Sequence, residues 1–186
     1  CTNTTGSTTI SGTASGGTVG GSGIFSSGTI NLSILDNTSA NHTIALPALS
    51  IANPGDLRVQ INANHTWVGD LRFTLTSPCG VTYLFDRPGL ATSTGCCGNS
   101  ADLNGVYTFD LAAATVLPEA AATPAGTYRP SDLVGNPHNW AGMTFPCPTA
   151  GNWTIDVFDG ASGDQGTLVE WAIIVNAGYT HVLTGP

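Results

Sequence analysis

The sequence has 186 residues, which is enough for one domain with a hydrophobic core of its own. It contains no lysine, and its four arginines stand against twelve carboxylates, giving a formal net charge of −8. Clustered Lys and Arg side chains hold phosphate backbones and anionic lipids, so this balance argues against nucleic acid and anionic membranes as partners. No apolar run reaches the ~20 residues that a membrane-spanning helix needs.

The first 23 residues consist of Ser, Thr and Gly with three isolated aliphatic residues. This composition predicts a flexible linker. The alternative is an extended arm that adds to the edge of a sheet, because Thr-rich stretches accept β structure. No signal peptide is visible ahead of Cys1, so we expect the chain to be a processed or trimmed form.

From residue 24 onward, apolar and polar residues alternate in short runs separated by turn residues. Strands are expected over residues 30–34, 57–62, 71–76, 81–85, 107–109, 153–157 and 169–175. Alternation places the apolar residues of each strand on one face, which must then meet a second sheet. The sequence therefore predicts an all-β, jelly-roll-like antiparallel β-sandwich with long loops over residues 24–176, followed by a tail, 177–186.

Residues 86–148 form the longest irregular stretch. Within it, residues 112–122 contain helix-forming side chains, but Pro118 interrupts them. We expect one or two helical turns there at most.

Five cysteines indicate an oxidising compartment and hence a secreted, extracellular protein. Adjacent cysteines rarely bond to each other, because the closed ring needs a strained peptide bond. Cys96 and Cys97 are therefore expected to reach other partners, with Cys79 and Cys147 as the candidates. The odd count leaves one thiol over, so Cys1, Cys96 or Cys97 is a candidate for a link to another chain, with Cys1 at the tip of the arm.

Two segments carry long motifs, H-T-W-V-G-D-L-R-F-T-L-T-S-P-C-G over residues 65–80 and G-N-W-T-I over residues 151–155. The second continues with Asp159, Gly166-Thr167-Leu168 and Trp171. Together they resemble the P domain (Homo B domain) that follows the catalytic domain in subtilisin-like proprotein convertases and in bacterial secreted proteases. The resemblance covers residues 24–176 and implies a jelly-roll-like sandwich appended to a protease. The same residues also read as fold determinants, with turn dipeptides and large apolar core residues.

The chain lacks the sequence context of a subtilisin nucleophile and of its histidine. Its four histidines, His42, His65, His138 and His181, coexist with many Ser and Asp residues, but no G-x-S-x-G elbow is present. We expect no catalysis by this chain.

Calcium is the metal that the sequence favours, since hard cations prefer several oxygen ligands. Asp159 and Asp164 share one Gly-rich loop, and Asp70 and Asp110 would approach it if the sheets stack as in the family. Some P-domain relatives bind calcium. The alternative is a solvated acidic turn held by Asx hydrogen bonds.

Two function classes follow. The first is an accessory module that stabilises a catalytic protease domain or holds a protein surface. The second is a structural or adhesive extracellular subunit, such as a filament or adhesin component, that self-associates through its N-terminal arm and its cysteines.

Overall fold

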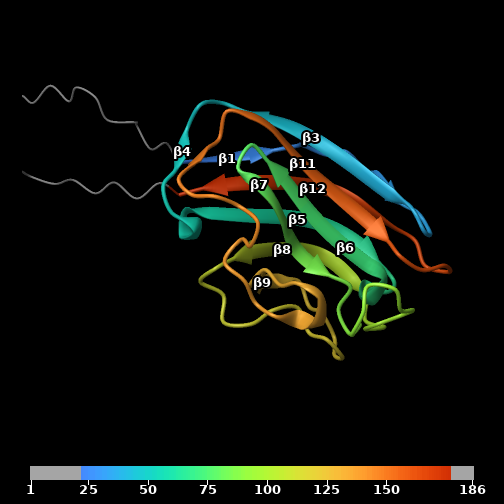
Figure 1. Cartoon of the computed structure of the whole chain (residues 1–186). Coiled ribbons are helices and arrows are strands. Elements are labelled where there is room, and N and C mark those ends of the chain that lie inside the picture. The colour runs from blue at the N-terminus through green and yellow to red at the C-terminus, as the bar shows by residue number, and fades with distance from the viewer. Residues whose placement is uncertain (1–21, 177–186) are drawn as a thin grey trace, which may run out of the picture.

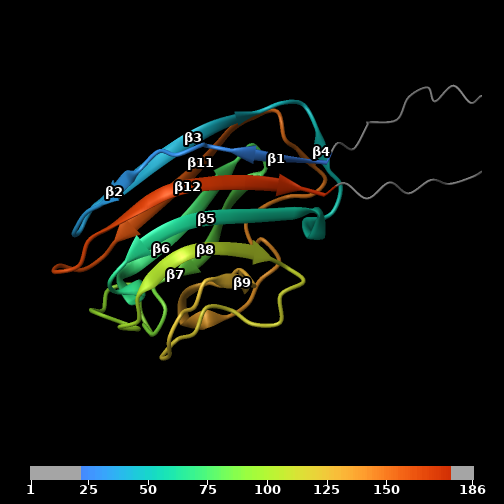
Figure 2. The same ribbon diagram turned by 180° about the vertical axis from the view of Figure 1, so that it is seen from behind.

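The computed structural model describes residues 22–176, so Cys1, His181, nearly all of the expected arm and the tail from residue 177 lie outside the described residues. Within this range, two mainly antiparallel β-sheets pack face to face, as the alternating pattern predicts (Figures 1 and 2). No helix among residues 22–176 is long and apolar enough to cross a membrane.

The first sheet has the order β1-β12-β5-β8-β9. Its strands are β1 (Gly23–Ser26), β12 (Gly166–Val175), β5 (Leu57–His65), β8 (Leu103–Asp110) and β9 (Gly126–Tyr128). The short strand β2 (Leu32–Ile34) pairs with the beginning of β12, and β1 pairs with its end. The pairing of β8 with β9 is parallel, and the other ladders of this sheet are antiparallel.

The second sheet is fully antiparallel and has the order β3-β11-β6-β7. Its strands are β3 (Ser39–Leu46), β11 (Gly151–Asp159), β6 (Leu71–Ser77) and β7 (Gly80–Asp86). A small ladder of β4 (Ser50–Ile51) and β10 (Cys147–Pro148) lies apart from both sheets. Three short 3-10 turns complete the elements of residues 22–176, η1 (Pro54–Asp56), η2 (Val68–Asp70) and η3 (Leu133–Gly135).

The core lies between the two sheets and confirms the predicted alternation. Leu57, Val59 and Ile61 of β5 are fully buried, as are Phe73 and Leu75 of β6. The residues between them are less buried and face outward. The large buried side chains include Trp140, Trp153 and Trp171, of which Trp140 comes from the irregular stretch that offered no core pattern in the sequence.

Strand β3 was not predicted from the sequence, and residues 112–122 agree with the expectation of one or two helical turns at most. In β3 the inward positions include Ala40 and His42, which are weak apolar signals, so the alternation is hidden. Residues 112–122 contain turns and bends but no helix, because Pro118 removes a backbone donor in the middle of the run. Trp67, one of the large apolar residues of the first motif, is half-buried and not in the core, and it donates its Nε1–H to the carbonyl of Cys97.

The disulfide pairing differs from the one expected. Cys79 bonds to Cys147 with a Cα–Cα distance of 5.6 Å, and Cys96 bonds to Cys97. The reason is that residue 143 bridges to Gly80, which brings the following segment beside the β6–β7 turn that holds Cys79. The loop with Cys96 and Cys97 lies against Gly69, at the other end of the seven-residue strand β6, roughly 20 Å away along the strand.

Candidate functional site

A turn that crosses from the first sheet to the second builds the candidate site. β5 ends at His65, η2 covers Val68–Asp70, and β6 begins at Leu71, so the motif over residues 65–71 is this crossover. A Cβ on Gly69 would collide with the backbone nitrogen of Asn99 and with the carbonyl of Cys97. Only glycine lets the loop before Asn99 approach the turn this closely, which explains glycine at this place in the motif.

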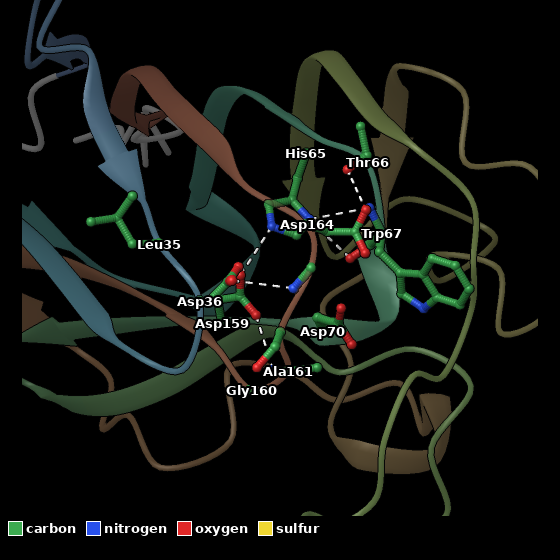
Figure 3. A network of polar contacts seen from close by, with 12 residues as sticks. Leu35, Asp36, His65, Thr66, Trp67, Asp70, Asp159, Gly160, Ala161 and Asp164 are labelled. Carbon is green, nitrogen blue, oxygen red and sulfur yellow. Dashed lines mark hydrogen bonds and ion pairs between the residues drawn. The ribbon is translucent and has the colours of Figure 1, made fainter.

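A buried histidine–carboxylate pair joins the two sheets at this end. Nε2 of His65 lies 3.2 Å from Oδ2 of Asp159, and its Nδ1 lies 3.0 Å from the carbonyl oxygen and 3.2 Å from the amide nitrogen of Trp67. Both side chains are 0% exposed. Oδ1 of Asp159 accepts the N–H of Ala161 at 3.1 Å, which fixes the start of the following loop (Figure 3).

Asp70 lies next to this pair, and its carboxylate has weaker polar contacts than that of Asp159. Its side chain is 3% exposed, Nη2 of Arg87 lies 4.0 Å from its Oδ1, and Oδ1 makes no hydrogen bond within the described part of the chain. Burial raises the pKa of Asp70 to about 6, and the negative charge of Asp159 adds to the rise, while Arg87 and His65 oppose it. Asp70 is therefore a carboxyl group that changes charge near neutral pH.

Arg87 is buried to a similar degree, at 3% exposure. It follows β7 directly and donates to two backbone carbonyls, Nη1 to Ser93 at 3.2 Å and Nη2 to Gly160 at 3.4 Å. It thereby connects the loop after β7 with the loop after β11. We name the four side chains His65, Asp70, Arg87 and Asp159 the buried network.

The structure brings three of the four expected calcium ligands to this end and leaves the fourth elsewhere. Asp164 accepts a hydrogen bond from the Thr66 hydroxyl at 2.6 Å, and its charge acts on Asp70 (Figure 3). Asp110 pairs instead with Arg58 at 2.6 Å, at the opposite end of β5 from His65. Among residues 22–176, no group of three or more His, Cys, Asp or Glu side chains is arranged to hold a metal ion.

Neither the buried pairing of His65 nor the position of Arg87 was predicted from the sequence. The pairing of His65 with Asp159 joins residues 94 positions apart. One signal was available, since both residues stand inside the two long motifs. For Arg87 no such signal existed, because its hydrogen-bond acceptors are backbone carbonyls.

No protein-family model and no curated protein matches the chain. The solved structures that are similar to the chain include two of an Aeromonas sobria protease. The crystal structure of the serine protease of Aeromonas sobria has 15% identity and a TM-score of 0.42, and the match covers 82% of this chain and 27% of that one. The complex of Aeromonas sobria serine protease with its chaperone gives 17% identity and a TM-score of 0.39, again over 82% and 27%. The chain spans about a quarter of the length of these solved chains.

Proposed function

We propose that the chain is a secreted, non-catalytic β-sandwich of the P-domain type that serves as an accessory module of a subtilisin-like protease. The observation that carries this proposal is the buried pair of His65 and Asp159. It joins the two motif segments on which the resemblance to the P domain rests, and it does so at the crossover between the sheets. Motifs that specify the fold in this way suit a stabilising module.

The geometry of His65 supports the non-catalytic part of the proposal. Its ring is fully buried, and both of its nitrogens are engaged in hydrogen bonds. A general base has to reach the proton that it removes from a substrate, and this ring is closed off from any substrate by the two sheets. The disulfide between Cys79 and Cys147 supports secretion.

Reading the coding sequence upstream of Cys1 tests the partnership. The proposal expects a subtilisin-type catalytic domain in the same reading frame. Adhesin-like or repetitive structural domains there would contradict it. A fluorophosphonate probe tests the catalytic part directly, because no serine of the isolated chain should react; stoichiometric labelling of one serine would mean that the chain is an enzyme.

One observation keeps the structural-subunit alternative in view. The four cysteines that the structure describes pair with one another, so a covalent link between chains would fall on Cys1, which lies outside the described residues. Light scattering under oxidising conditions separates the two functions. Assemblies that dissolve when residues 1–23 are removed or when Cys1 becomes Ser favour the subunit, and monomers at every concentration favour the accessory module.

A further inference from the structure

A groove lies on the outward face of the second sheet, away from the buried network. It has a volume of about 600 Å³ and crosses all four strands of that sheet. Its floor is built by the residues that alternate with the core residues, for example Thr154 between Trp153 and Ile155. The groove therefore rests on the rigid part of the fold and not on loops.

The ladder registers arrange the floor in two rows across the strands. In one row, Thr43, Thr154 and Thr76 stand side by side and end at Val81. At ~4.8 Å between neighbouring strands, this row is roughly 14 Å long, which exceeds the width of a single sugar ring. The Thr43 and Thr154 hydroxyls already hydrogen-bond to each other at 2.7 Å, so their orientation is fixed.

The second row carries the stronger polar groups. Asp156 stands between Asn41 and Thr74, and the row ends at Tyr83. Arg72 lies beside this row, with its guanidinium 4.9 Å from the centre of the Phe158 ring, which holds it over the sheet. Tyr83 is 38% exposed and Val81 is 50% exposed, so one wall of the groove is apolar and open to solvent.

The charges in the groove cancel. It contains one carboxylate, Asp156, and one guanidinium, Arg72, in a chain with a net charge of −8. A polyanion would meet a single cation on an acidic protein, and a polycation would meet a single anion. The groove suits a neutral ligand with many hydroxyl groups, since carboxylate, amide, guanidinium and threonine hydroxyls supply both donors and acceptors.

An extended peptide suits this face less well. The backbone groups of β11 and β6 are already paired with strands on both sides. A peptide that adds to a sheet takes its main-chain hydrogen bonds from a free edge, and the floor of the groove over β11 and β6 offers side chains only. A sugar chain needs no backbone partner, because its hydroxyls bond to side chains and the C–H face of a ring packs on an aromatic side chain.

We propose that the outward face of the second sheet is a binding site for a neutral polysaccharide chain, with Tyr83 as the ring against which a sugar packs and Asp156 as the acceptor of its hydroxyl groups.

Calorimetric titration with cellohexaose, chitohexaose, xylohexaose and laminarihexaose tests this site. At least one of these neutral hexasaccharides is expected to bind the full chain, and Tyr83→Ala and Asp156→Ala are each expected to weaken that binding at least tenfold. Tyr83→Phe keeps the ring and should bind as the parent does. Val106→Ala is the matched control, since Val106 is 44% exposed on the outward face of the first sheet.

Each other outcome overturns the assignment. If none of the four saccharides binds at 10 mM, or if the Tyr83 and Asp156 variants bind as tightly as the control, the groove is not a saccharide site. Display-selected peptides whose binding depends on Tyr83 would assign the groove to a peptide partner instead. Circular dichroism of each variant shows that it is folded, so that lost binding reports on the groove.

Discussion

The charge of Asp70 gives the most direct test of the buried network. The ordinary pKa of this carboxyl is 3.8, and burial beside Asp159 raises it to about 6 in the folded protein. Between these two values the folded state binds more protons than the unfolded state, so the Asp70 contribution to stability falls as the pH rises from about 4 through 6. At 1.36 kcal/mol per pH unit, the difference between the two pKa values lowers the free energy of unfolding by about 3 kcal/mol above neutral pH.

Asp70→Asn keeps the shape of the side chain and removes its charge. Any cost of the amide itself is the same at every pH, so the informative quantity is how the stability difference between variant and parent changes with pH. We expect this difference to shift by about 2 kcal/mol in favour of Asp70→Asn between pH 4 and pH 8, because part of the loss has already occurred at pH 4. The positive charge of Arg87 does not reverse the direction of this change with pH, because its effect is already included in the net rise of the Asp70 pKa.

Urea unfolding followed by tryptophan fluorescence at half-unit pH steps, with a chelator present and disulfides intact, measures this difference. Asp102→Asn removes one exposed carboxylate and controls for the change in net charge. A stability difference that is constant from pH 4 to pH 8 would refute the reasoning. A shift in favour of the parent would mean that Asp70 and Arg87 form a stabilising ion pair.

Three further outcomes are expected. Gly69→Ala should lower the free energy of unfolding by roughly 1–3 kcal/mol or more, because the added Cβ meets the backbone of Asn99. Gly55→Ala is the control and should change it little, because there is open space around Gly55. Equal effects of the two substitutions would count against the close approach of the Asn99 backbone to Gly69. Non-reducing peptide maps should join Cys79 to Cys147, and removing both should cost about 2–5 kcal/mol, whereas five free thiols would contradict the pairing. If calcium binds, the loop of Asp159 and Asp164 should be part of the site: excess calcium should then raise the melting temperature and Asp164→Asn should remove the rise, whereas an unchanged melt in the parent would eliminate calcium.

The strands that bury one clear apolar face were predictable from the sequence. β5, β6 and β11 show the period of two that a half-buried strand imposes, and β12 shows it at Trp171, Ile173 and Val175, after a bulge between Leu168 and Glu170. β3 was not, because its inward residues include alanine and histidine. His42 has a structural reason to face inward, since its Nδ1 accepts the Nε1–H of Trp171 at 3.1 Å. Such a pair joins residues 129 positions apart and leaves no local pattern.

The candidate site was predictable only where carboxylates stand in turns. Asp159 and Asp164 share a loop, and Asp70 belongs to the crossover motif, so their approach followed from a sandwich. Asp110 was wrongly expected near Asp159. Because β8 runs antiparallel to β5, Asp110 at the end of β8 pairs with Arg58, at the opposite end of β5 from His65. The pairing of Cys79 with Cys147 depended in the same way on how the loop before β10 folds back on the β6–β7 turn.

Strand β11 connects the buried network with the groove. Its inward residues end in Asp159, which bonds to His65, and its outward residues include Thr154 and Asp156 on the groove floor. Because successive side chains of a strand point to opposite faces, the register of β11 sets both surfaces at once. A slip by one residue would move Asp159 out of the buried pair and turn Asp156 into the core. The His65–Asp159 bond, which ties the end of this strand to the first sheet, therefore also fixes the position of the polar row that faces the solvent.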